Sequence, residues 1–374
     1  MKKALLILTA LLAIACIGAM PFLCTHSDIL PEVSTAYYDY KAKEDALTAT
    51  GPEAELMRML TGLSADTKLE PVKTPIKFSW FGLYLTIGAV VAILLLLWLT
   101  RKQTSLRQAL LWTTVLSVPF GLIGARLVYC LVNISFYLNA ISAPEAMLKV
   151  WEGGLSLGGA LVFIVLAGVI GAKIARFSVG PLLYTLVPAL LVFCTFVSIG
   201  VETNNMGFGP EVEHLVGSFT AMFGETRRLN TAMMVASITA ALATAFFIHG
   251  KLLITRGKLN PSLQFALYTF LYGSVMILME SLREDGHMVW GFVHAEMAFD
   301  LCFALPALLY LAKTKKRILL ALLATAVLAG AVVALEFALD RSSIGDGLLY
   351  AAYVAVLGGY IFFGCTCAKK RLAV

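Results

Sequence analysis

The chain has 374 residues, of which 59% are hydrophobic and only 14% are charged. This balance is typical of a polytopic membrane protein and excludes a soluble enzyme with a large core. The net charge of +6 does not indicate nucleic-acid binding, because the basic residues cluster in short connections between apolar runs. The seven cysteines lack the spacing of a metal site, so we expect neither a metal nor another cofactor.

The first 74 residues contain two predicted segments outside the main membrane region. In residues 1–23, Lys2 and Lys3 precede a long apolar run, which predicts either a cleaved signal sequence or a retained N-terminal anchor helix. Residues 24–74 are polar and weakly acidic and have too few large apolar side chains for a core of their own. They predict a small extracytoplasmic appendage.

Nine further apolar runs are long enough to cross about 30 Å of hydrocarbon as helices. They lie at 80–99, 110–132, 155–172, 181–199, 231–248, 263–282, 291–311, 318–339 and 348–364. Together with the N-terminal run they predict an all-α polytopic membrane protein with about ten transmembrane helices.

The connections between these runs predict the orientation of the chain. The basic residues in alternate connections are Arg101, Lys102, Arg107, Lys173, Arg176, Lys251, Arg256, Lys258, Lys313, Lys315, Lys316, Arg317, Lys369, Lys370 and Arg371. If every span is real, they share one side with Lys2 and Lys3, and the positive-inside rule makes that side cytoplasmic. Both termini are then cytoplasmic. The longer, glycine-rich and acidic connections at 133–154, 200–230, 283–290 and 340–347 face outward.

The stretch 272–285, YGSVMILMESLRED, combines an apolar helix with a charged end. Tyr272, Met276, Glu280 and Arg283 follow one another at helical spacing and share one face. Charged groups near hydrocarbon cost a few kcal/mol or more, so they normally face a bundle interior or water. The simpler interpretation is that these charges lie in the headgroup layer. Arg126 ends another span on the same side, however, which favours a functional site there.

Five stretches, in order, resemble the prolipoprotein diacylglyceryl transferase family. They are PIKFSWFGLYLTIG at 75–88, GARLVYCLVN at 124–133, VWEGGLSLGG at 150–159, SIGVETNNMGFG at 198–209 and YGSVMILMESLRED at 272–285. The resemblance implies a seven-helix membrane core over residues 75–312. Residues 313–374 would then add a helical hairpin and a cytoplasmic tail.

The resemblance implies transfer of diacylglyceryl from phosphatidylglycerol to the lipobox cysteine of a prolipoprotein in a bacterial plasma membrane. The thiol needs a base or a positive field to ionise, and arginine stabilises a departing phosphate well. The retained family positions, expected to bind the lipid, are Arg126, Tyr129, Asn204, Tyr272, Glu280 and Arg283. Arg126 is expected to hold the phosphate of phosphatidylglycerol or another anionic phospholipid, and Glu280 and Arg283 to shape the headgroup pocket. Arg126, Tyr272, Glu280 and Arg283 should then converge on one cavity open to the outer leaflet.

Several family positions are replaced. Gly158 stands where the family has a histidine, and Met276 where it has an arginine. The signature loop has Ser198, Val201 and Met206 at polar or charged family positions, and LNTAMM follows Arg228 in place of a His-Pro motif. Losing one electrostatic donor can cost about a hundredfold in rate, so these replacements are expected to weaken catalysis. A second hypothesis is therefore a non-catalytic partner subunit of the same fold that binds a phospholipid, a lipoprotein or a membrane protein. We find no inverted repeat that would indicate a transporter.

Other polar residues near the outward side were considered as substitutes. They are Glu202, Glu211, Glu213, His214, His287, His294 and Glu296. His214 and His287 are expected to be solvated loop residues. His294 is expected to be a hydrogen-bonded packing residue, and with Glu296 it does not form a metal motif, because residues i and i+2 point to different helix faces.

Overall fold

The computed structural model describes residues 2–23, 31–48, 76–212, 219–343 and 345–372, together with residues 55, 58, 59, 69, 72 and 217. It is an all-α polytopic membrane protein, as predicted. Nine helices of this described part are long and apolar enough to span a membrane. They are α1 (Lys2–Ala19), α4 (Trp80–Leu99), α5 (Thr104–Val132), α6 (Leu157–Ala175), α7 (Val179–Thr203), α8 (Thr231–Thr255), α9 (Pro261–Ser281), α11 (Lys315–Arg341) and α12 (Asp346–Leu372).

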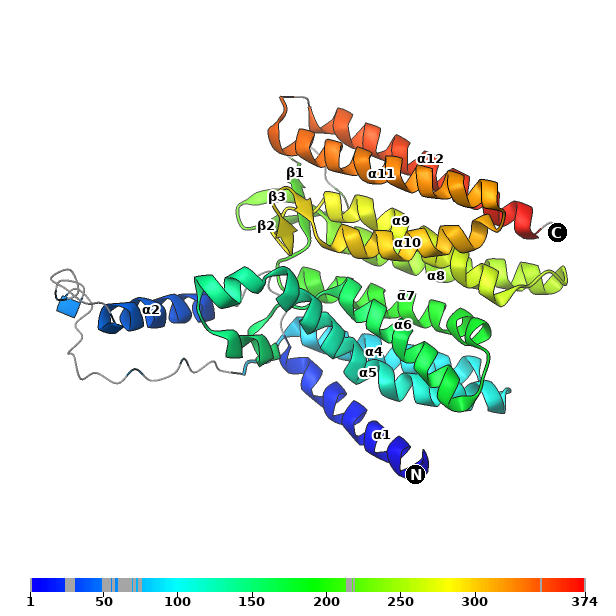
Figure 1. The fold of residues 1–374 in the computed structure, drawn as a ribbon, viewed down its shortest axis with the longest axis horizontal. Helices are drawn as coiled ribbons and strands as arrows, with labels where there is room; N and C mark the ends of the chain where they lie inside the picture. Colours follow the sequence, from blue (N-terminus) through cyan, green and yellow to red (C-terminus); the bar gives the residue numbers. More distant parts are fainter. Residues whose placement is uncertain are drawn as a thin grey trace.

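The helix of the span predicted at residues 291–311 begins later than the sequence suggested. Its helix, α10 (Glu296–Ala312), has 17 residues, the lower end of the length that crosses a bilayer. The residues before it form a short hairpin of β4 (Val289–Trp290) and β5 (Val293–His294). Figure 1 shows α10 running along α9 and α11, as a crossing helix would.

Side-chain caps and prolines define where several helices begin. Ser156, Asn230, Asn260 and Thr314 precede α6, α8, α9 and α11, and each accepts a hydrogen bond from the backbone N–H three residues later. Such caps satisfy N–H groups that the helix itself leaves unpaired. Pro261 adds a residue with a preset φ angle at the start of α9.

The helices pack as neighbouring pairs. Helix α5 lies against α6, α4 against α7, and α9 against α10. Figure 1 also shows the predicted outward connections gathered at one end of the bundle. That end carries a three-stranded antiparallel sheet, in the order β1-β3-β2, made of β1 (Phe208–Glu211), β2 (Thr220–Phe223) and β3 (Thr226–Asn230). It also carries short helical turns over Phe136–Ala140, Pro144–Leu148 and Val150–Glu152.

The predicted appendage contributes helix α2 (Pro31–Thr48), which projects from the same end (Figure 1). The Tyr37 hydroxyl donates to Glu152 Oε1 at 3.1 Å and accepts from Lys149 Nζ at 2.7 Å. Because Tyr37 is only 2% exposed, these bonds attach α2 firmly to the turn before α6. Most of the rest of the appendage lies outside the described residues.

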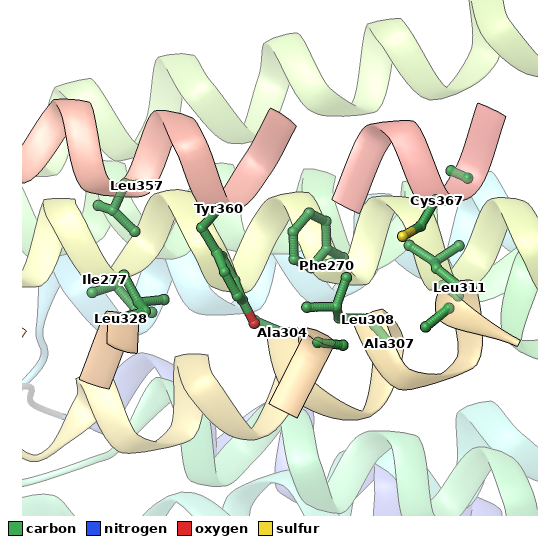
Figure 2. Close-up of a cluster of buried hydrophobic side chains, with 14 of the residues drawn as sticks. Phe270, Ile277, Ala304, Ala307, Leu308, Leu311, Leu328, Leu357, Tyr360 and Cys367 are labelled. Carbon is green, nitrogen blue, oxygen red and sulfur yellow. The ribbon is translucent and has the colours of Figure 1, made fainter. Parts of the chain in front are cut away.

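The C-terminal hairpin of α11 and α12 packs on α9 and α10 through a shared apolar cluster (Figure 2). The rings of Phe270 on α9 and Tyr360 on α12 lie 5.2 Å apart. The Tyr360 hydroxyl is 2.9 Å from the Thr325 hydroxyl on α11, so the polar end of the ring is satisfied. The hairpin is therefore part of the same packed body as the preceding helices.

A glycine in α12 makes this packing testable. A Cβ at Gly364 would overlap the buried ring of Phe270, whereas a Cβ at Gly359 would meet nothing within 4 Å. We expect Gly364→Ala to lower the free energy of unfolding by about 1–3 kcal/mol, as overpacking does. Gly359→Ala, the control, should raise it by up to about 1 kcal/mol, because alanine favours helix. Thermal melts of both variants in detergent check this prediction. An equal increase in the melting temperature of both variants would contradict the packing.

Candidate functional site

A cavity of about 190 Å³ lies inside the bundle and extends to the end that carries the sheet. Its apolar part is lined by α4, α5 and α7, with side chains that include Phe81, Leu85, Ala89, Val118, Leu122, Leu190, Phe193 and Val197. Its polar part is lined by Ser156, Ser198, Thr231, Tyr272, Glu280, Arg283, His287, Glu296 and Asp300. The lining therefore suits a molecule with an apolar chain and a polar head.

Arg283 is the centre of the polar part. Its Nη1 donates to both oxygens of Glu280 at 3.1 Å, and its Nη2 donates to Asp285 Oδ2 at 2.7 Å. The Arg283 and Glu280 side chains are only 13% and 14% exposed. Arg283 Nε is buried and has no hydrogen-bond partner among the described residues. The guanidinium group is therefore held in place while its Nε donor stays unused by the described residues.

These ion pairs shift the pKa values of the groups beyond the end of α9. Burial alone would lower the pKa of Arg283, but the carboxylates of Glu280 and Asp285 outweigh it and raise that pKa above its ordinary value. Burial alone would raise the pKa of Asp285, but Arg283 holds it well below its ordinary value. Both groups therefore stay charged across the physiological range.

Asp285 also connects the site to the sheet. Its Oδ2 accepts from the backbone N–H of Gly207, just before β1, at 2.8 Å. Arg228 on β3 bonds Glu284 at 2.9 Å and Glu211 at 2.8 Å. The two glutamates are 45% and 51% exposed, and such pairs contribute only about 0–1 kcal/mol. The buried Asp285 is the stronger link between the sheet and the site.

Two buried carboxyl groups of α10 face the same cavity. Glu296 is 6% exposed, and its Oε2 accepts from the backbone N–H of Gly158 at 3.0 Å. Its Oε1 is buried with no hydrogen-bond partner in the described part of the chain. A Cβ at Gly158 would lie 2.5 Å from Glu296 Oε2, so the glycine leaves the room that the carboxylate occupies. Asp300, one helical turn further along α10, is also 6% exposed.

His287 is buried, and the prediction of a solvated loop residue is wrong. It is 4% exposed, lines the cavity, and stacks on the ring of Tyr129 with centroids 5.9 Å apart. The loop folds inward because Asp285 Oδ1 accepts from the His287 backbone N–H at 3.2 Å. His294 is 8% exposed and does not line the cavity. His214 and Glu213 lie outside the described residues.

The burial of His287 predicts a loss of stability in acid. Burial and the nearby charge of Arg283 lower the pKa of His287 to about 3. An unfolded chain binds a proton there below about pH 6.5, whereas the folded chain does not, so stability is complete above that pH and falls as the pH drops toward 3. The slope is up to about 1.4 kcal/mol per pH unit. Melting curves between pH 7.5 and 5 should show a smaller acid shift for His287→Gln than for the wild type.

The half-buried His249 on α8 provides the control for this experiment. His249→Gln should keep most of the acid sensitivity of the wild type. Equal sensitivity in wild type and His287→Gln would show that His287 does not titrate in this way.

Arg126 lies away from the cavity, although it was expected to converge on it with Tyr272, Glu280 and Arg283. It is 5% exposed and does not line the cavity. Its guanidinium group donates to the backbone carbonyl oxygens of Ala146, Met147, Lys149, Gly153 and Gly154. In this structure Arg126 therefore orders the turn that leads into α6 and Gly158.

Of the other predicted site residues, one lines the cavity and two do not. Tyr272, 8% exposed, lines the cavity with Glu280 and Arg283, and its hydroxyl accepts from Cys194 Sγ at 3.9 Å. Tyr129 packs between Arg126 and His287 and does not line the cavity. Asn204 is the C-cap of α7 and does not line it either.

Sequence reasoning missed Asp300 and gave Glu296 little weight. The available signal was a carboxyl group inside an apolar run, which by itself marks a functional position in a membrane protein. Met276, at the position of a family arginine, does line the cavity. The polar part consequently contains one arginine and three carboxyl groups.

Comparisons with known proteins identify the family of this chain. The family model described as prolipoprotein diacylglyceryl transferase matches residues 71–313. Proteins named phosphatidylglycerol–prolipoprotein diacylglyceryl transferase are similar to this chain. That of Listeria monocytogenes is 24% identical over 247 residues, which are 62% of this chain and 85% of the relative. That of Caldanaerobacter subterraneus is 26% identical over 216 residues, which are 58% of this chain and 77% of the relative. The resemblance seen in the five motifs is confirmed.

Proposed function

This chain belongs to the prolipoprotein diacylglyceryl transferase family, and we propose that it transfers diacylglyceryl from a phospholipid to the cysteine thiol of a lipobox. The observation that carries the proposal is that two residues lining one amphipathic cavity each have a buried polar atom without a hydrogen-bond partner among the described residues. Arg283 Nε is a buried donor without a partner among the described residues, and Glu296 Oε1 is a buried acceptor of the same kind. A donor suits a phosphate oxygen, and an acceptor suits a thiol proton.

The lipid would enter with its acyl chains toward the apolar lining of α4, α5 and α7. Its phosphate would accept from Arg283 Nε, and the proposed donor lipid is phosphatidylglycerol or another anionic phospholipid. The printed names of the relatives, which specify phosphatidylglycerol and a prolipoprotein, support this choice. As the glycerol phosphate departs, negative charge grows on its oxygen, where a fixed guanidinium group is most useful. Glu280 and Asp285 fix Arg283 for that contact.

We also propose that the protein lies in the plasma membrane with both termini cytoplasmic and the site on the extracytoplasmic side. Charge supports this orientation. Arg101, Lys173, Arg256 and Lys369 lie at or just beyond the C-terminal ends of α4, α6, α8 and α12. Figure 1 shows these helix ends on the side of the bundle opposite the sheet. The positive-inside rule assigns that end to the cytoplasm. The membrane core would span residues 75–312, with the α11–α12 hairpin and the tail as an addition beyond it.

The function can be tested with the purified full-length chain in phosphatidylglycerol vesicles. A lipobox peptide is added, and its mass is followed with time. We expect the peptide to gain one diacylglyceryl group through a thioether, and a peptide with serine in place of cysteine to stay unchanged. Bound lipid with no change in the cysteine peptide would contradict transfer and favour a non-catalytic, lipid-binding partner subunit.

A further inference from the structure

Transfer to a thiol requires a group that accepts the thiol proton. A free cysteine thiol supplies little thiolate at neutral pH, because its pKa is about 8.5. The acceptor must reach the bound substrate, so it must line the cavity. Four titratable side chains of the polar part can accept a proton in principle: those of Glu280, His287, Glu296 and Asp300.

Three of these four are poorly suited. Both oxygens of Glu280 are engaged by Arg283. His287 is a weak base, because burial and Arg283 lower its pKa to about 3. Asp300 lies one helical turn further along α10 than Glu296, and so further from the end of the bundle where the polar groups gather.

Glu296 differs from the other three because one oxygen is fixed and the other is free. The backbone N–H of Gly158 holds Oε2 at 3.0 Å, which orients the carboxylate, and Oε1 has no partner in the described part of the chain. A carboxylate removed from water is a stronger proton acceptor than one in solution. It must also be within hydrogen-bonding reach of the proton it takes. Glu296 lines the cavity, and Oε1 is the carboxylate oxygen that the described residues leave unpaired for the thiol of a bound substrate to approach.

We propose that Glu296 is the catalytic base of the transfer reaction, and this inference rests on the proposed function. The thiol proton passes to Glu296 Oε1 as the cysteine sulfur forms a bond to the glyceryl carbon that bears the phosphate. The carbon–oxygen bond to the phosphate breaks, and its electron pair leaves with the glycerol phosphate. The proton on Glu296 then passes to the departing phosphate or to water. No oxidation or reduction takes place.

The test combines a conservative variant with a nucleophile that needs no base. Glu296→Gln keeps the size of the side chain and an oxygen for the Gly158 N–H, but it cannot accept the proton. Each protein is given two lipobox peptides, one with cysteine and one with selenocysteine, whose selenol is already ionised at neutral pH. The control variant is Glu336→Gln, because Glu336 on α11 is also buried, at 5% exposed, but does not line the cavity.

We expect Glu296→Gln to lose about a hundredfold or more in rate with the cysteine peptide and to stay within about tenfold of the wild type with the selenocysteine peptide. Glu336→Gln should follow the wild type with both. Equal loss with both peptides, or no loss with cysteine, would overturn the assignment of Glu296 while leaving the transferase function in place. A wild type that modifies neither peptide would instead remove the proposed function, and this inference with it.

Discussion

Replacing Arg283 by glutamine is expected to lower the rate of diacylglyceryl transfer by at least about a hundredfold. The variant loses the Nε donor proposed to bind the phosphate and the positive charge that offsets the carboxylates around the cavity. It also leaves Glu280 and Asp285 without the partner that they share. Breaking a buried pair in this way destabilises a protein by about 3–5 kcal/mol. Rates with the lipobox peptide and melting temperatures are therefore measured on the same samples.

Arg228 provides the matched control for Arg283. It also carries two ion pairs at the same end of the bundle, but its partners are half-exposed and it does not line the cavity. Arg228→Gln should therefore change both rate and stability only slightly. A folded Arg283→Gln protein with a rate within about tenfold of the wild type would show that phosphate stabilisation does not depend on this residue.

The second large effect is expected when Arg126 is replaced, and it is a loss of stability of the folded protein. In Arg126→Met the five carbonyl oxygens of the turn before α6 lose their shared donor, and we expect a loss of about 3–5 kcal/mol in the free energy of unfolding. The turn leads to Ser156 and Gly158, so transfer should also fall through misplacement of the site. The exposed Arg107, on the same helix, provides the control, and Arg107→Met should be neutral.

Lipid retention separates the two roles considered for Arg126. If it orders the turn, any folded fraction of Arg126→Met should still copurify with phospholipid. A variant that melts like the wild type but retains no phospholipid would assign Arg126 to the phosphate instead, as the family resemblance implied.

Much of the architecture was predictable because a bilayer imposes long apolar runs and a one-sided distribution of basic residues. Tyr272, Glu280 and Arg283 were also predictable as a group, since a single helix face and the residue just beyond it bring them together. Arg126 was different, because its partners are backbone carbonyls of a turn some 20 to 28 residues away. No pattern of residue types reveals that the turn folds over it.

The sheet and His287 were missed for related reasons. Strands such as Phe208–Glu211 and Thr226–Asn230 are short and contain glycine, proline or charged residues, so they lack the alternation that indicates a strand. His287 follows a run of charged residues, which by itself suggests a solvated loop. It is buried only because Asp285 turns the chain inward through bonds to Arg283 and Gly207.

The proposed function requires that this cavity carries out transfer and does not merely hold a lipid. The most direct measurement uses phosphatidylglycerol labelled with one isotope in the acyl chains and another in the headgroup glycerol, incubated with the full-length protein and the cysteine lipobox peptide. We expect the acyl label in the peptide and the headgroup label in released glycerol phosphate, in equal amounts. Both labels remaining together in protein-bound lipid, with the peptide unlabelled, would contradict it.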